Sequence, residues 1–124
     1  MISGIGVDIV KIARFEGKAE NSKFMARIFT TREQDYLANK SIQSMAGLFA
    51  AKEAVAKALG TGFRGFSPCD IEITHDELGK PQVVLHNAAN ETIKNTTKKA
   101  VKTAQILLSI SHNETDAVAF AVVE

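Results

Sequence analysis

Apolar residues alternate with small or polar ones at the beginning of the chain. The apolar positions of this pattern are Ile2, Ile5, Val7 and Ile9. Such a repeat of two is typical of a strand that has one buried face. The pattern predicts an opening strand closed by Asp8, and the residues after it predict a short helix over residues 12–19.

Helix-start signals follow in the next part of the chain. Asn21 and the serine after it can cap a short helix that runs through Ile28. Thr30 and Glu33 have the spacing of a capping box, in which each side chain bonds to the backbone of the other residue. This second signal predicts a helix that ends near Asn39.

The longest helical run begins after Ser41 and ends at Gly60, where glycine can adopt the positive φ of a helix C-terminus. Glu53 and Lys57 are four residues apart, so they lie side by side on this helix. Their face also holds Ala46, Phe49, Ala50 and Ala56. These small neighbours leave room for another group to approach. A surface ion pair worth a few tenths of a kcal/mol is the alternative interpretation.

The second half of the chain predicts strands and one further helix. The expected elements are a strand over 70–74, a turn over 76–81, a strand over 82–85, a helix over 87–102, and strands over 106–111 and 117–123 joined by a hairpin turn at 112–115. Antiparallel strands with helices on one side predict an α+β fold in a single domain over residues 1–124.

Composition narrows the class of protein. The 124 residues, 45% of them hydrophobic, are typical of one globular domain. No apolar run approaches the length of a membrane span, and the first residues lack the pattern of a signal peptide. The single cysteine, Cys69, excludes an internal disulfide and a cysteine metal site. We therefore expect a cytoplasmic protein that does not bind membranes.

Charge is unevenly distributed, although the formal net charge is only +1. Six bases lie between residues 11 and 32, namely Lys11, Arg14, Lys18, Lys23, Arg27 and Arg32, against Glu16 and Glu20. This segment is either a solvated helical face or a docking surface for an acidic protein. A second cluster, Lys94, Lys98, Lys99 and Lys102, predicts a solvated face. Because no recognition motif accompanies the bases, nucleic acid is not an expected partner.

Two carboxylates are candidates for chemistry. Asp8 at the end of an apolar strand caps the next helix or pairs with a cation. Asp8 and Glu53 together with phosphate oxygens would form a typical magnesium site. His112, at the mouth of a turn, contacts an anion or is a simple turn residue, while His75 and His86 have no such context. The loop that begins at Gly60 and Gly62 follows a helix, whereas phosphate loops usually precede one.

The order of these motifs is more specific than any one of them. They are Gly4-Ile5-Gly6-Val7-Asp8-Ile9 with Arg14, Arg27-Ile28-Phe29-Thr30 with Glu33, the run over 49–62, Asp70-Ile71-Glu72-Ile73, Gly79-Lys80-Pro81 and Ser109-Ile110-Ser111-His112. From end to end the chain resembles the holo-[acyl-carrier-protein] synthases, the short group of 4′-phosphopantetheinyl transferases. The resemblance implies their fold, a small antiparallel sheet packed on one long helix and shorter helices.

The resemblance also implies a reaction. The 4′-phosphopantetheine group of coenzyme A moves to a serine of apo acyl carrier protein, and adenosine 3′,5′-bisphosphate leaves, in fatty acid biosynthesis. Asp8 and Glu53 would bind the magnesium ion that the reaction requires. Glu53, directly or through a metal-bound water, would be the base for the serine hydroxyl, and Lys57 would neutralise charge on the phosphates.

Binding roles follow from the same resemblance. The residues implied to contact coenzyme A are Lys57, Gly60, Gly62, Lys80, Pro81 and His112. Arg14 and Arg27 match the basic face that binds the acidic carrier protein. The family is typically trimeric, with each active site between two subunits, so we expect a homotrimer.

One position departs from the family pattern. Members commonly carry an arginine before the Phe-Ala-Ala-Lys-Glu core of the long helix, and this chain has Leu48. Because leucine cannot form a bidentate phosphate contact, we expect weaker coenzyme A binding unless Arg64, Lys52 or Lys80 compensates. A coenzyme-binding relative without turnover and a structural protein whose acids cap helices are the alternatives.

Overall fold

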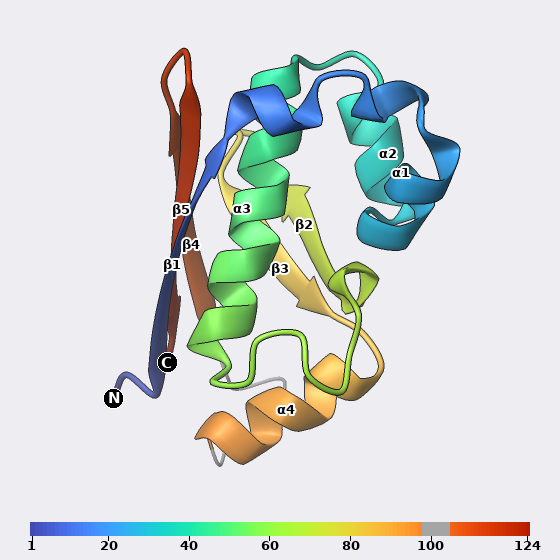
Figure 1. The fold of residues 1–124 in the computed structure, drawn as a ribbon. Coiled ribbons are helices and arrows are strands. Elements are labelled where there is room, and N and C mark those ends of the chain that lie inside the picture. The colour runs from blue at the N-terminus through green and yellow to red at the C-terminus, as the bar shows by residue number, and fades with distance from the viewer. Residues whose placement is uncertain (98–104) are drawn as a thin grey trace.

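One long helix, α3 (Ile42–Ala58), runs through the middle of the molecule between two antiparallel sheets (Figure 1). The computed structural model describes residues 1–97 and 105–124. Its other elements are β1 (Gly4–Lys11), the 3₁₀ turns η1 (Ile12–Phe15) and η2 (Lys18–Glu20), α1 (Ser22–Ile28), α2 (Thr31–Leu37), η3 (Pro68–Asp70), β2 (Ile71–His75), β3 (Pro81–Leu85), α4 (Ala88–Thr97), β4 (Ile106–His112) and β5 (Asp116–Val123). The predicted α+β fold is confirmed.

The strands form two sheets in place of the single sheet that was expected. The larger sheet has the order β1-β5-β4, and the smaller one pairs β2 with β3. Both are antiparallel throughout. In the described part of the chain, no helix is long and apolar enough to cross a membrane.

The beginning of the chain differs from the prediction in two ways. β1 continues through Lys11, so Asp8 lies inside the strand and does not close it. The helix expected over residues 12–19 is wrong, because Gly17 adopts a left-handed conformation with φ 75° and divides this segment into η1 and η2. The segment nevertheless turns the chain sharply toward α1 (Figure 1).

The predicted helix starts are confirmed by their caps. The Asn21 side chain accepts a hydrogen bond from the backbone N–H of Phe24 over 3.0 Å. Thr30 and Glu33 form a complete capping box at the start of α2. At its other end, α3 is followed by Gly60 with φ 92°, as expected for a helix C-terminus. The helix expected over 87–102 is present as α4, and residues 98–104 lie outside the described residues.

The small residues of α3 bring the helix against β1. A Cβ atom added at Gly4 would lie 1.9 Å from the carbonyl oxygen of Ala58, and one at Gly6 would lie 2.0 Å from that of Ala54. Ala46, Ala50 and Ala56 are fully buried. The room that these alanines leave is therefore occupied by other parts of the chain.

A buried ion pair joins α2, α3 and β2. The Lys52 ammonium lies 2.6 Å from the Glu33 carboxylate, and both side chains are buried. Lys52 also donates hydrogen bonds to the carbonyls of Pro68 and Ile71. Glu33 accepts a further bond of 2.8 Å from the backbone N–H of Ile73. The hydrogen bonds and the ion pair of Lys52 are thus made in the core. Lys52 cannot replace, as a phosphate ligand, the arginine that the family has at the position of Leu48.

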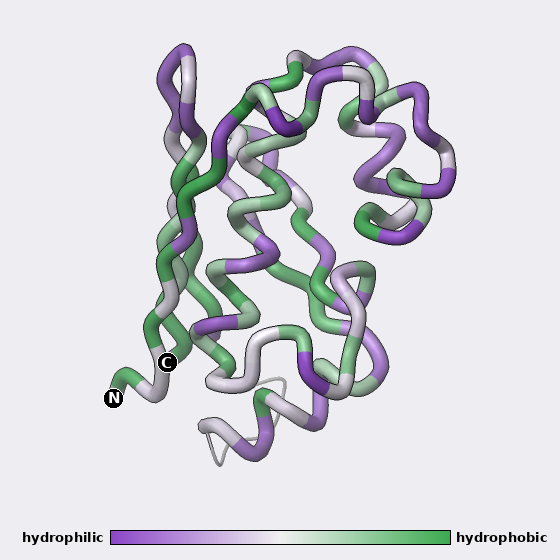
Figure 2. The backbone as a smooth tube through the Cα atoms, viewed as in Figure 1, coloured by the Kyte–Doolittle hydropathy of each residue, from purple (hydrophilic) through white to green (hydrophobic). Residues whose placement is uncertain are grey.

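The outer face of the three-stranded sheet is apolar and exposed. Ile5, Val7 and Ile9 of β1 are 62%, 53% and 66% exposed, and Phe120 of β5, the partner of Val7, is 44% exposed. Figure 2 shows hydrophobic residues along these strands, next to the chain termini. The alternation at the start of the chain therefore marks a face that points away from α3.

Candidate active site

Asp8 and Lys57 meet where β1 packs on α3. Asp8 is opposite the buried Ala119 of β5 and projects to the inner face of the sheet. The Lys57 ammonium lies 3.0 Å from Asp8 Oδ1 and donates a bond of 2.9 Å to the carbonyl of Val7. The other carboxylate oxygen, Asp8 Oδ2, is buried and has no hydrogen-bond partner among the described residues. A buried oxygen without a donor is costly unless a cation accompanies it.

Glu53 lies close enough to this pair to share its electrostatics. Burial raises the pKa of the Glu53 carboxyl, and the negative charge of Asp8 raises it further. Lys57 and Arg14 act in the opposite direction without cancelling the shift. A carboxylate whose pKa is raised toward neutrality is suited to accept a proton during catalysis.

The residues present suit a hard divalent cation. Magnesium is usually held by one or two carboxylates, with water and phosphate oxygens completing its coordination. Asp8 offers the unpaired oxygen Oδ2, and Glu53 offers a second carboxylate beside it. Within residues 1–97 and 105–124, no group of three or more His, Cys, Asp or Glu side chains could hold a metal ion. Two carboxylates suit magnesium when water and phosphate oxygens supply the rest of its coordination.

The predicted carrier-binding arginines share an aromatic surface beside Glu53. The Arg14 guanidinium lies 5.5 Å from the ring centre of Phe49, one turn before Glu53 on α3. The Arg27 guanidinium lies 5.9 Å from the ring centre of Phe24. Such contacts hold a cation over an aromatic face without neutralising it. A positively charged, partly apolar surface therefore adjoins the two carboxylates.

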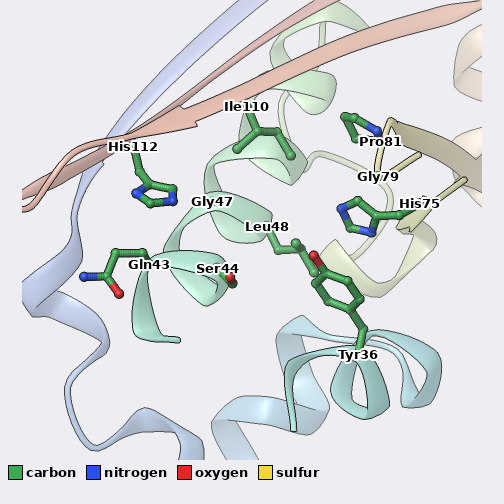
Figure 3. A pocket seen from close by; sticks show the side chains of 10 residues that line it. All are labelled: Tyr36, Gln43, Ser44, Gly47, Leu48, His75, Gly79, Pro81, Ile110 and His112. Atoms are coloured by element: carbon green, nitrogen blue, oxygen red, sulfur yellow. The ribbon is translucent and has the colours of Figure 1, made fainter. Parts of the chain in front are cut away.

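A pocket of about 220 Å³ lies on the other side of α3. It is lined by Tyr36, Gln43, Ser44, Gly47, Leu48, His75, Gly79, Pro81, Ile110 and His112 (Figure 3). The structure thus brings His112 together with the turn before β3 and with Leu48, the residue that departs from the family pattern. Lys80 itself is not among these lining residues.

Two side chains of this pocket were missed by the sequence analysis. The rings of Tyr36 and His75 are stacked, with centres 4.4 Å apart and planes 10° apart. The two residues are far apart in the chain and belong to α2 and β2, so no local pattern signals their contact. His75 was accordingly assigned no role.

The candidate residues fall into two groups within one chain. One group surrounds Asp8, and the other lines the pocket at His112. Asp8 belongs to β1 and His112 to β4, and these strands are opposite edges of the three-stranded sheet. Gly60 and Gly62 follow the end of α3 and do not line the pocket. The end of α3 is ten residues beyond Leu48, which corresponds to about 15 Å along the helix. One protomer does not bring all predicted site residues together.

Comparisons with known proteins give one consistent result. The family model of the 4′-phosphopantetheinyl transferase superfamily matches residues 4–121. A holo-[acyl-carrier-protein] synthase of Clostridium perfringens is 52% identical over an alignment that covers all of this chain and 95% of the relative. The crystal structure of the synthase from Neisseria meningitidis superimposes with a TM-score of 0.83 at 37% identity, covering 100% of this chain and 99% of that one. The Helicobacter pylori synthase in complex with coenzyme A gives a TM-score of 0.80 at 33% identity, covering 97% and 99%.

Proposed function

Because this chain belongs to the holo-[acyl-carrier-protein] synthases, a family of 4′-phosphopantetheinyl transferases, we propose that it modifies an apo acyl carrier protein for fatty acid biosynthesis in the cytoplasm, in a magnesium-dependent reaction. A bond forms between a carrier serine oxygen and the phosphorus of phosphopantetheine. The bond from that phosphorus to adenosine 3′,5′-bisphosphate breaks. The observation that carries the proposal is the buried oxygen of Asp8, which has no hydrogen-bond partner in the described part of the chain, within electrostatic range of the Glu53 carboxyl.

Each residue of this group has a distinct role in the proposal. Asp8 and Glu53 would hold magnesium, which supplies positive charge to the pyrophosphate of coenzyme A. Glu53 accepts the proton of the serine hydroxyl, as a carboxylate within reach of the reacting oxygen can do. Lys57, half-exposed at the edge of α3, places a fixed ammonium beside Asp8 and the transferring phosphoryl group.

Coenzyme A would extend from these carboxylates to the pocket at His112. Pro81 and His112 line that pocket, and Lys80 lies in the adjoining turn. Gly60 and Gly62, which follow the end of α3, would contact the coenzyme from outside the pocket. Because Leu48 occupies the arginine position of the family, coenzyme binding would be weaker than in members that keep the arginine. The phosphopantetheine arm of the coenzyme would lie near Glu53.

The acidic carrier protein would dock on the surface formed by Arg14 and Arg27. Both cations are held over phenylalanine rings, and Arg14 is close enough to Glu53 to lower its pKa. A carrier bound there would present its serine to the carboxylates. Charge complementarity of this kind chiefly speeds association and selects the partner.

We further propose that the protein is a homotrimer with active sites between subunits. The apolar outer face of Ile5, Val7, Ile9 and Phe120 would be covered by neighbouring copies, as exposed apolar patches commonly are. The division of the site supports the same arrangement. Asp8 at one sheet edge of a subunit would face the His112 edge of the next, so each active site would use residues of two chains.

Mass spectrometry of the carrier protein tests the function directly. Purified protein is mixed with apo carrier protein, coenzyme A and magnesium, and a second sample contains a chelator. We expect the carrier mass to rise by one phosphopantetheine group in the first sample only. An unchanged carrier mass in both samples would contradict the proposal, and magnesium-dependent coenzyme binding without transfer would indicate a relative that has lost turnover.

A further inference from the structure

The pocket around Leu48 has polar groups but no permanent charge. Among its lining residues in the described chain there is no lysine, arginine, aspartate or glutamate. Gln43 and Ser44, from the first turn of α3, contribute an amide and a hydroxyl. Its basic side chains are the imidazoles of His75 and His112. Within one subunit, positive charge in this pocket therefore arises when an imidazole takes up a proton.

His75 is held in a defined orientation at one side of the pocket, with His112 at the other (Figure 3). Its ring stacks on Tyr36, and the Lys40 ammonium lies 5.0 Å from the centre of the Tyr36 ring. Stacking fixes the plane of the imidazole before any ligand arrives. The ring therefore has little conformational freedom to lose on binding.

The charges around His75 favour its neutral form when the pocket is empty. Burial lowers the pKa of His75, and the positive charge of Lys40 lowers it further, while Asp76 in the following turn raises it. Arg32 lines a neighbouring hollow together with Tyr36 and His75 and adds a second positive charge on that side. An anion placed in the pocket would act in the opposite direction and raise the pKa of His75.

We propose that His75 takes up a proton to bind a phosphate group of the adenine nucleotide in this pocket. The protonated imidazole would replace the arginine that the family pattern has at the position of Leu48. The inference rests on the proposed function, because that function brings a phosphorylated nucleotide to His112 and Pro81. His112 faces the same ligand from β4. His75 is thus a determinant of coenzyme affinity, and its contribution depends on pH.

The proton uptake predicts the sign of the pH effect. The pKa of His75 is lowered in the empty pocket and raised in the complex, so binding takes up a proton in the interval between the two values. In that interval the dissociation constant rises by up to about tenfold for each pH unit. Above both values His75 is neutral in either state and contributes no charge.

Calorimetric titration with adenosine 3′,5′-bisphosphate tests the inference. The pH is varied from about 7 to about 8.5, where the phosphate groups are already ionised, since their second pKa is about 6. We expect the affinity of the unaltered protein to fall at least about threefold over this range, with proton uptake visible as a buffer-dependent heat. His75→Phe keeps an aromatic ring against Tyr36 and should bind with no such pH dependence.

Leu48→Arg serves as the complementary variant. A fixed guanidinium should strengthen binding at high pH and reduce the pH dependence. If His75→Phe and the unaltered protein show the same affinity and the same pH profile, the role of His75 is contradicted. The carrier-mass assay on the same preparations separates the two proposals. If the carrier is modified but the binding profiles of His75→Phe and the unaltered protein are the same, only the role of His75 is overturned. If the carrier is not modified, the transferase function is overturned.

Discussion

At the scale of single residues, the candidate site depends on charges that are incompletely neutralised. Asp8 uses one carboxylate oxygen to bind Lys57, and its other oxygen is buried without a donor among residues 1–97 and 105–124. Glu53 lies in the field of Asp8 and is partly removed from water, which raises its pKa. Elsewhere in the same helix, Lys52 has three partners and is fully satisfied. Incomplete pairing therefore distinguishes the candidate site acids from Lys52, which has a structural role.

Glu53→Gln should abolish proton acceptance while preserving size and shape. We expect turnover to fall by at least about 100-fold, the usual contribution of a general base. The measurement is the rate of carrier modification at saturating coenzyme A and magnesium. Glu77→Gln, in an exposed turn, is the matched control and should retain full activity. Turnover of the Glu53 variant within a few-fold of the unaltered protein would exclude the base role.

The same substitution should affect stability in the opposite direction. Because the pKa of Glu53 is raised in the folded protein, its ionised form is disfavoured there, and the group lowers stability once the pH exceeds its ordinary value of about 4.5. Without magnesium, Glu53→Gln should therefore raise the melting temperature at pH 8. The difference should vanish at acidic pH, where both side chains are neutral. Equal melting temperatures throughout would contradict the raised pKa.

Glu72 supplies a contrast for that experiment. Burial alone would raise the pKa of its carboxyl, but hydrogen bonds from Thr30 and His86 outweigh burial and lower it. A lowered pKa in the folded state adds stability above the unfolded value, which is lost as the pH falls. Glu72→Gln should accordingly lower the melting temperature at neutral pH.

At the scale of elements, α3 carries both the candidate site residues Glu53 and Lys57 and the buried base Lys52. Alanines on this helix and glycines on β1 permit backbone contact between the two. Lys52 and Glu33 attach the same helix to α2 and β2. Glu53 and Lys57 project from a helix that is held on both sides. The position of the acids therefore depends on contacts at a distance from the chemistry.

Removal of the buried cation tests this attachment. Lys52→Met should destabilise the protein by about 3–5 kcal/mol, because the Glu33 carboxylate would be buried without its partner. Chemical denaturation followed by circular dichroism measures the change. Lys94→Met removes an exposed ion pair with Glu91 and should cost at most about 1 kcal/mol. Equal losses in the two variants would contradict the structural role of Lys52.

At the scale of the whole molecule, two surfaces of the protomer are unlike the rest. One is the apolar outer face of the three-stranded sheet, and the other is the basic surface with Arg14 and Arg27. The first suits other copies of the chain, and the second suits an acidic protein. Together they account for a site whose residues lie at two edges of the sheet.

Val7→Asp should separate the subunits. Its side chain is 53% exposed in the protomer and opposite Phe120, so a carboxylate there would be buried only in the assembly. Light scattering after size exclusion should show trimers for the unaltered protein and monomers for the variant. Turnover should fall by about 100-fold or more, since the two groups of residues would no longer face each other. Leu78→Asp, in an exposed turn, should leave assembly and activity unchanged.

Arg14→Glu should weaken docking of the carrier protein. Reversal of this charge should raise the KM for carrier protein by about tenfold, with coenzyme A binding little changed. Steady-state rates at varied carrier concentration measure the effect, and Lys94→Glu on α4 is the control for a change of net charge. An unchanged KM for the Arg14 variant would place carrier docking on another surface.

Local patterns in the chain predicted three helix starts with their caps, and they set out the order of motifs. Asn21, Thr30 and Ser41 act through hydrogen bonds to residues only three positions away, so their effect is visible in the chain. The same is true of Gly60, whose positive φ ends α3. The motif order also indicated the family, which the comparisons confirm.

The faces that these elements bury, and the residues that they contact, depend on tertiary contacts. Whether Ile5 and Val7 point toward α3 or away from it depends on Gly6 meeting Ala54, a contact between distant segments. Lys52 is a core residue because Glu33 lies across from it, and His75 enters the pocket because Tyr36 stacks on it. Local patterns report neighbours within a few residues. Burial, pairing and pKa shifts come from contacts between residues that are far apart in the chain.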